Sequence, residues 1–182
     1  MSERRFPTGA GARVTERRSS RQVLSERSLR SCLGRFATGV AVVTFDTPAG
    51  RHGITVNSFT SVSLDPPLVL VAVAKTARSH DALPGRPFSV NVLGAEQEAL
   101  ARAFAGGPVM DVPWMDGEYA PRLGGALATL ECTAWHQYDG GDHTLFLGEV
   151  KAFEYRDGDA LAFLSSSYHT IVEQELGVEY LI

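Results

Sequence analysis

The alternation of apolar and polar positions along most of this chain predicts strands. The runs GVAVVTFDT (39–47) and PFSVNVL (87–93) have the length of strands and are bounded by turn-forming residues. The run PPLVLVAVA (66–74) is almost wholly apolar, which is typical of a strand that is buried on both faces or lies in a barrel wall. The turn cluster PAGRHG precedes the alternating run ITVNSFTSVSL (54–64), so we expect a hairpin whose second strand is this run.

Three segments have the apolar spacing or the composition of short helices. They are residues 25–38, 75–86 and 95–106. The first begins at Ser25, whose side chain suits an N-cap, and apolar residues follow at spacings of four and three. The second is expected to end near Pro84. In the third, which is rich in alanine, Leu100 and Phe104 share one face, and Gly106 ends the helix.

The last third of the chain alternates well and contains turn motifs at DGGD and RDGD. We expect residues 126–171 to form three strands joined by hairpins, the last of them ending at Tyr168, and residues 106–122 to form a loop. The whole pattern predicts about seven strands and two or three short helices. Because most strands are joined by short turns, the sheet should be mainly antiparallel, in a barrel or a sandwich.

Charge is distributed unevenly along the chain, although the net charge is only −4. The first 35 residues carry nine arginines and three glutamates, whereas residues 36–182 carry eight basic and eighteen acidic side chains. We therefore expect an Arg-rich disordered tail, residues 1–25, and one globular domain, residues 26–182. A tail that binds nucleic acid or a partner is the alternative, but it lacks interleaved aromatic residues and the acidic domain would repel phosphate. This excludes nucleic acid as the main partner.

The sequence also indicates the cellular compartment of the protein. No stretch reaches the roughly 18 apolar residues that a membrane span needs, and no apolar segment follows the N-terminal arginines as in a signal peptide. The two cysteines, Cys32 and Cys132, lie far apart and form no CxxC pair. We expect a reduced, cytoplasmic protein without a membrane partner.

Several common functional motifs are absent from the sequence. There is no GxGxxG for a Rossmann fold, no GxxxxGK[ST] for a P-loop and no GxSxG nucleophile elbow. The five histidines do not have the paired spacing of a metal site, so we expect no metal. Spacing alone leaves a Ser-His-Asp triad open.

Small polar side chains are concentrated between Gly53 and Ser63. A turn or bulge after Thr60 would let Ser61 and Ser63 present backbone N–H groups and hydroxyls together, which suits a phosphate or a ring rich in acceptors. The segment KTARS (75–79) adds two cations and two hydroxyls where a strand ends, and this favours an anion. The alternative for the first stretch is that its hydroxyls simply fill a sheet.

The segment GDHT follows a predicted tight turn. A histidine in this place, His143, would be held at the rim of a barrel, where a ligand can reach it. The alternative is a histidine that only caps the turn.

Six segments occur in an order and at separations that are usual for one known family: FATGVAVVT, HGITVNSFTSVSLDPPLVLVAV, FSVNVLGAEQEALARAFAG, LGGALATLEC, GDHTLFLGEV and LAFLSSSYH. With this set the chain resembles the short-chain flavin reductase family, the reductase partners of two-component flavin-dependent monooxygenases. The resemblance covers about residues 29–171. It implies a mainly β fold with short helices, an antiparallel split β-barrel of Greek-key type that binds FMN or FAD, and a homodimer with the flavin at its interface.

The resemblance also implies which side chains surround the flavin. These are Thr55, Val56, Asn57, Ser58, Phe59, Ser61, Val62, Thr76, Ala77, Arg78, Ser79, Phe104, Ala105 and Tyr168. The stretch 55–59 would line the isoalloxazine ring and the ribityl chain, and residues 61–62 would lie near the phosphate. Residues 76–79 would hold the phosphate or the outer part of a dinucleotide, and the step 104–105 would lie near the ring. His143 would lie beside the nicotinamide and the flavin ring, as the catalytic residue.

The implied activity is the reduction of FMN or FAD by hydride transfer from NADH or NADPH, with the reduced flavin passing to a partner monooxygenase by diffusion. The protein would supply position and electrostatics to chemistry that belongs to the flavin. Two alternatives stay open at this point. One is a flavin-binding or storage protein, and the other is a split-barrel flavoenzyme that does not turn over free flavin.

Overall fold

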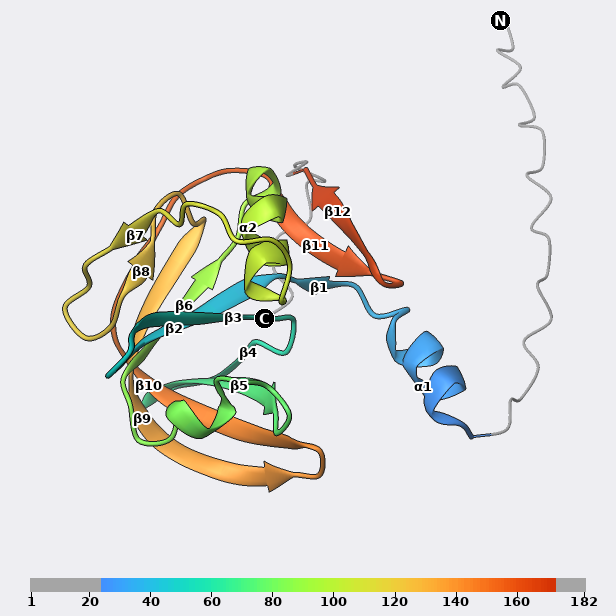
Figure 1. Ribbon diagram of the computed structural model, residues 1–182, viewed down its shortest axis with the longest axis horizontal. Coiled ribbons are helices and arrows are strands. Elements are labelled where there is room, and N and C mark those ends of the chain that lie inside the picture. Colours follow the sequence, from blue (N-terminus) through green and yellow to red (C-terminus); the bar gives the residue numbers. More distant parts are fainter. Residues whose placement is uncertain (1–23, 173–182) are drawn as a thin grey trace, which may run out of the picture.

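The computed structural model describes residues 24–172, and its centre is a curved antiparallel sheet of seven strands (Figure 1). Across the sheet the strands follow the order β3-β2-β6-β9-β10-β5-β4. Their bounds are β2 (Ala41–Thr47), β3 (Gly50–Val56), β4 (Thr60–Leu64), β5 (Pro67–Ala74), β6 (Phe88–Val92), β9 (Ala128–Gly140) and β10 (His143–Tyr155). Three hairpins are therefore interleaved with longer connections, as in Greek-key barrels. The predicted mainly β, antiparallel fold is confirmed.

Two smaller sheets accompany the main one. A three-stranded sheet has the order β1-β11-β12, and β7 pairs with β8. Their bounds are β1 (Thr38–Gly39), β7 (Trp114–Met115), β8 (Arg122–Leu123), β11 (Ala160–Leu164) and β12 (Ser167–Ile171). The helices are α1 (Glu26–Leu33) and α2 (Glu98–Phe104), with single 3₁₀ turns at η1 (His80–Ala82) and η2 (Ala95–Gln97).

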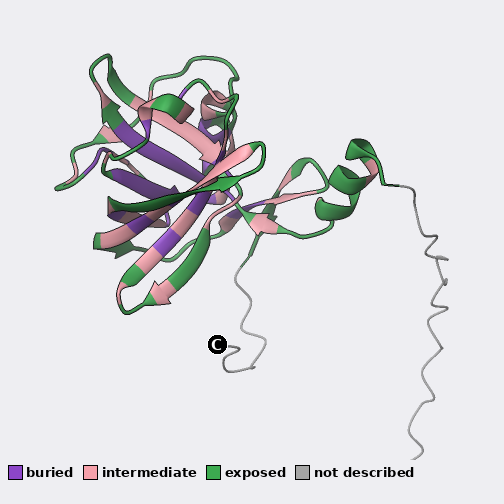
Figure 2. Cartoon of the chain, turned by 90° about the horizontal axis from the view of Figure 1, so that it is seen from below, coloured by how far each residue is buried: buried purple, intermediate pink, exposed green. Residues whose placement is uncertain are grey.

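The first helix forms where its cap and its spacing predict it. The Ser25 side chain accepts a hydrogen bond from the backbone N–H of Ser28, and Arg30 pairs with Glu26 at 2.9 Å. Nevertheless, α1 has no buried residue, and Leu33 on its apolar face is 65% exposed. Figures 1 and 2 show this helix standing beyond the main sheet.

The strand β2 is buried on both faces because two hydrophobic clusters flank it. Val43 and Phe45 point into the barrel interior, which is the first cluster. Val42 points the other way, into the second cluster, together with Leu100 of α2 and Leu161 of β11. A strand with two apolar faces reads as a continuous hydrophobic run, which explains the sequence VAVVTF.

The predicted helix over residues 75–86 is wrong. The segment forms successive turns closed by hydrogen bonds between residues three apart, of which only η1 is a helical turn, and contacts with distant residues hold it in place. The backbone N–H of Lys75 donates to the carbonyl of Asp142, and His80 Nε2 forms a hydrogen bond with Thr144 Oγ1 at 2.8 Å. These contacts link the loop to β10, and periodicity over so few residues could not reveal them.

Two strand predictions also need correction. The run 54–64 is not one strand: β3 ends at Val56, and the chain turns before β4 starts at Thr60. The predicted irregularity after Thr60 is present, as a register shift between Ser61 and Ser63. The C-terminal region has four strands instead of three, because β11 and β12 are separated by a turn at residues 165–166. Both serines there have positive φ, at 50° and 66°, without the glycine or asparagine that normally announces such a turn.

The structure does not test the predicted boundary between the tail, residues 1–25, and the domain, residues 26–182. Residues 1–23 of the tail, and residues 173–182 of the predicted domain, lie outside the described part of the chain. Between residues 24 and 172, the model contains no helix with the length and apolar character needed to cross a membrane.

Candidate functional site

A groove of about 630 Å³ lies between β3, the loop 75–79 and the end of α2. Its volume falls within the roughly 300–1,000 Å³ of typical small-molecule sites. The residues that line it are Arg51, His52, Gly53, Ile54, Thr55, Thr76, Ala77, Arg78, Ser79, Ala103, Phe104, Ala105 and Gly106. Strand pairing and helix packing thus bring together three segments that are far apart in the sequence.

One wall of the groove is formed by an aromatic ring lying on a glycine. A Cβ on Gly53 would lie 2.5 Å from Cε1 of Phe104, so only glycine lets the ring approach β3 this closely. The Thr55 hydroxyl donates to the carbonyl of Ala101 at 2.7 Å and holds α2 against the same strand. Trp114 meets Phe104 edge-on, with ring centroids 5.8 Å apart. The ring of Phe104 is thereby fixed as an aromatic part of the groove lining, against which a planar ring can pack.

Another wall of the groove, residues 76–79, carries one cation, Arg78, and two hydroxyls. Ser79 is only 6% exposed, and its hydroxyl lies 2.7 Å from Nε2 of His52. Lys75 forms an ion pair with Asp139, which lowers the pKa of that carboxyl, chiefly through their hydrogen bond. Arg78 is exposed at the groove and pairs with no acidic residue in the described part of the chain. This wall suits an anionic group such as a phosphate.

His143 begins β10 at the same end of the barrel. It lies opposite Ala74 in the antiparallel register, directly beside the loop 75–79. Its Nδ1 is 2.7 Å from a carboxylate oxygen of Asp142, and this hydrogen bond lowers the pKa of the Asp142 carboxyl. The side chain is 42% exposed, so Nε2 can meet a ligand. His143 does not, however, line the groove itself.

A smaller cavity of about 170 Å³ adjoins the groove across β3. Its lining consists of Val40, Thr55, Val56, Asn57, Phe163 and Tyr168. Tyr168 packs edge-on against Phe163, and the Arg102 guanidinium lies 4.9 Å from the centre of its ring. Burial raises the pKa of the Tyr168 hydroxyl, which therefore stays protonated at neutral pH and can donate a hydrogen bond.

The structure distributes the predicted flavin-binding residues among three environments. The groove holds Thr55, Thr76, Ala77, Arg78, Ser79, Phe104 and Ala105, and the smaller cavity holds Val56, Asn57 and Tyr168. Four others line neither space: Ser58, Phe59, Ser61 and Val62. The Ser58 hydroxyl bonds both backbone groups of Ala72, and Phe59 packs against the barrel core. Ser61 pairs with Val69 on the sheet, and Val62 is 47% exposed beside the bulge.

Sequence reasoning missed several groove residues on β3. Arg51, His52 and Gly53 were assigned to a turn cluster because glycine and proline surround them, but they belong to the strand itself. Strand alternation carried through Gly50–Val56 would have placed His52 and Ile54 on the face opposite to Gly53 and Thr55. It would not have shown that α2 and the loop 75–79 lie beside this strand.

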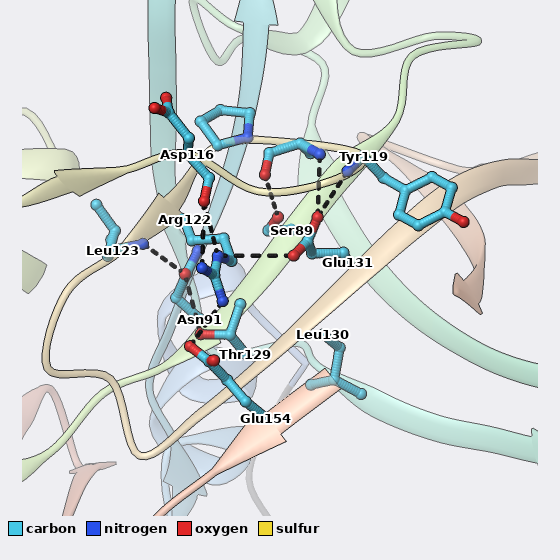
Figure 3. Close-up of polar contacts among 12 residues, drawn as sticks. Ser89, Asn91, Asp116, Tyr119, Arg122, Leu123, Thr129, Leu130, Glu131 and Glu154 are labelled. Carbon is cyan, nitrogen blue, oxygen red and sulfur yellow. Dashed lines mark hydrogen bonds and ion pairs between the residues drawn. The ribbon is translucent and has the colours of Figure 1, made fainter. Parts of the chain in front are cut away.

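A buried polar network holds the segment that carries Trp114 against the sheet (Figure 3). Glu131, 5% exposed, accepts a hydrogen bond from the backbone N–H of Tyr119 at 2.7 Å and lies 3.6 Å from the Arg122 guanidinium. Asn91 accepts from the backbone N–H of Leu123 at 2.9 Å. The network keeps the loop after α2 folded back over the edge of the groove.

The same loop reaches the groove through a charged contact. Arg51 forms an ion pair with Asp116, and its guanidinium lies 6.0 Å from the centre of the Trp114 ring. Arg51 of β3 therefore contacts the loop after α2 and also lines the groove. Residues 24–172 contain no cluster of three or more side chains that could hold a metal ion.

The sequence of this chain is similar to a known family model and to several characterised proteins. The model of the flavin reductase-like domain matches residues 33–172. FMN reductase (NADH) SmoA of Agrobacterium fabrum is 45% identical over 148 residues, covering 79% of this chain and 85% of that protein. The reductase component of 4-hydroxyphenylacetate 3-monooxygenase from Thermus thermophilus is 36% identical over 149 residues, covering 81% of this chain and 97% of that protein.

A solved structure agrees with these sequence matches. The Streptomyces globisporus NADH:FAD oxidoreductase SgcE6, in complex with NAD and FAD fragments, superimposes with a TM-score of 0.78 at 41% identity. The match covers 85% of this chain and 99% of that one.

Proposed function

This chain belongs to the flavin reductase-like domain family, and we infer from its groove that it reduces FMN or FAD with NADH or NADPH by hydride transfer. One observation carries the inference. The groove joins the aromatic ring of Phe104 to a loop, residues 76–79, that carries two hydroxyls and one guanidinium. A flavin mononucleotide has the matching pair of features, a planar ring and a phosphate.

The residues present fit such a ligand. The ring of Phe104 lies in the space that a Cβ on Gly53 would fill. Because the ring lies so close to β3, it leaves room for a ligand in the groove. Thr76, Arg78 and Ser79 offer two hydroxyls and a guanidinium to a phosphate at the other end. A bound flavin supplies the acceptor atom for the hydride, and the protein supplies its place and surroundings.

The side chains of this site orient reactants and do not form covalent bonds with them. Hydride transfer needs the donor carbon and the acceptor atom about 3–3.5 Å apart and stacked. We propose that His143, fixed through Nδ1 by Asp142, uses its outward Nε2 to position the nicotinamide over the flavin ring. Backbone N–H groups around Asn57, where β3 ends, are our candidates for stabilising negative charge on the reduced ring.

Turnover of free flavin distinguishes this function from the alternatives. Purified protein with added FMN or FAD should oxidise NADH through many cycles, followed at 340 nm. Without oxygen and with flavin in excess, a storage protein would stop after one equivalent of NADH per chain, whereas a reductase would reduce the whole pool of free flavin. The variant His143→Ala should lower kcat/KM for NADH by about tenfold or more, whereas His136→Ala, on the exposed part of β9, should leave it unchanged. Oxidation at the rate without protein, for both flavins and both nicotinamides, would contradict the function.

We further propose that the protein works as a homodimer and hands reduced flavin to an oxygenase by diffusion. Relatives named as reductase components of monooxygenases support an oxygenase partner. Exposed apolar side chains at the end of α1, just after it and on β4, namely Leu33, Phe36 and Leu64, are suited to burial against a second copy. Sedimentation of the purified protein measures the dimer directly, and a mass of one chain at micromolar concentration would contradict it.

A further inference from the structure

One histidine of the groove is not used by the mechanism above. His52 lies on β3, opposite Phe45 in the register with β2, and its ring packs against Phe45 with centroids 5.6 Å apart. Its Nε2 is 2.7 Å from Oγ of Ser79, a residue 27 positions away that is 94% buried. Both side chains line the groove. The contact is therefore a built hydrogen bond between the strand and the loop that carries Arg78.

The direction of this hydrogen bond decides what Ser79 can offer to a ligand. A hydroxyl has one proton to donate and two lone pairs that accept. If the Ser79 hydroxyl donates to Nε2, it has no proton left for a ligand. If Nε2 carries the proton and donates, Ser79 accepts through one lone pair, and its own proton is free to point into the groove. No other side chain or backbone group between residues 24 and 172 takes that proton.

An anion in the groove selects the second arrangement. The hydroxyl of Thr76 and the guanidinium of Arg78 lie on the same loop as Ser79 and attract negative charge to it. A phosphate oxygen accepts hydrogen bonds only, so it requires the Ser79 proton and therefore the proton on Nε2 of His52. In a chain of hydrogen bonds each bond polarises the next, and this strengthens the last bond, the one to the charged group.

We propose that His52 is a positioning residue for the flavin phosphate: it fixes the Ser79 side chain and directs the Ser79 hydroxyl proton toward the phosphate. This inference rests on the proposed flavin site. It assigns to His52 a role in flavin affinity and selectivity, and none in hydride transfer.

Riboflavin provides the discriminating ligand because it has the same ring and ribityl chain as FMN but no phosphate. Dissociation constants for both are measured by quenching of flavin fluorescence, which does not depend on turnover. In His52→Leu the constant for FMN should rise about tenfold, the effect of one hydrogen bond to a charged group. The constant for riboflavin should stay within about twofold of wild type, because the lost hydrogen bond serves only the phosphate.

Three further variants separate positioning from packing. His52→Gln, whose side-chain amide can donate to Ser79, should recover most of the FMN affinity. Ser79→Ala should match His52→Leu, and combining the two should add little, since both interrupt one chain of hydrogen bonds. The matched control His136→Leu replaces an exposed histidine of β9 and should bind both flavins like the wild type.

Two results would overturn the proposal. One is an equal weakening of FMN and riboflavin in His52→Leu, which would indicate a packing role. The other is FMN affinity that is unchanged in that variant. Failure of the proposed reductase function is recognised separately, as a wild-type protein that binds FMN but does not oxidise NADH. Wild-type protein that binds neither flavin would refute both.

Discussion

The contact between Gly53 and Phe104 gives the sharpest test of how the groove is built. The substitution Gly53→Ala adds a single methyl group to β3. That carbon would lie 2.5, 2.6 and 3.0 Å from Cε1, Cδ1 and Cζ of the Phe104 ring. Carbon atoms in contact normally keep about 3.5–4.0 Å apart, so the ring has to retreat by about 1 Å.

The retreat is costly because the ring is held on its other side. Trp114 meets it edge-on with centroids 5.8 Å apart, and the remaining direction leads into the groove. Overpacking of this kind costs about 1–3 kcal/mol. For a protein of this size, about 2 kcal/mol lowers the melting temperature by roughly 4–8 °C. A ring displaced by about 1 Å toward the flavin should reduce kcat/KM for FMN by up to about a hundredfold.

Gly39→Ala is the matched control. A Cβ at Gly39, on β1, would have no atom within 4 Å, so we expect a change in unfolding free energy within about 0.5 kcal/mol and normal kinetics. A double-mutant cycle with Phe104→Ala completes the test. Once the ring is removed, adding Gly53→Ala should cost nothing further, which appears as a coupling energy of about 1–3 kcal/mol. The reasoning is refuted if Gly53→Ala melts and turns over like the wild type, or if the two substitutions are additive.

Two further predictions concern the described part of the chain away from the flavin. Glu131→Gln weakens charge-assisted hydrogen bonds at a carboxylate that is 5% exposed, so the free energy of unfolding in urea should fall by about 2 kcal/mol with an unchanged m-value. An unchanged midpoint would contradict the network's role. Burial, with a smaller contribution from Glu131, raises the pKa of the Cys132 thiol to about 12, whereas Cys32 is exposed. At pH 8 a thiol reagent should therefore label Cys32 rapidly and Cys132 only after unfolding; two rapid equivalents would be the contrary result.

Local elements of the fold were predictable where the deciding interactions are close in sequence. Ser25 caps α1 through a residue three positions away, and Gly106, with φ at 92°, follows the C-cap of α2. The loop 75–86 was misread as a helix because its partners, His52 and Thr144, are distant along the chain. The turn at Ser165 and Ser166 was missed because serine, unlike glycine or asparagine, does not indicate a positive φ.

The residues of the candidate site also fall into those that the sequence could predict and those that it could not. The segments 55–59, 76–79 and 104–105 were proposed from residue type and from the family resemblance, and the structure places parts of all three around one groove and its neighbouring cavity. Arg51 and His52 could not be proposed, because nothing within β3 indicates which helix or loop lies beside it. Their importance depends on contacts with Asp116 and Ser79.

By itself, the sequence determined most strands of the main sheet, their antiparallel arrangement, the helices α1 and α2 and the family, because period, capping and motif order are properties of short stretches of chain. Only the tertiary structure decided which of these stretches meet. The register of β2 with β3 and of β5 with β10, together with the packing of α2, brings Gly53 under Phe104 and His52 onto Ser79. Contacts of this kind depend on side-chain packing and hydrogen bonds between distant segments, and no local pattern encodes them.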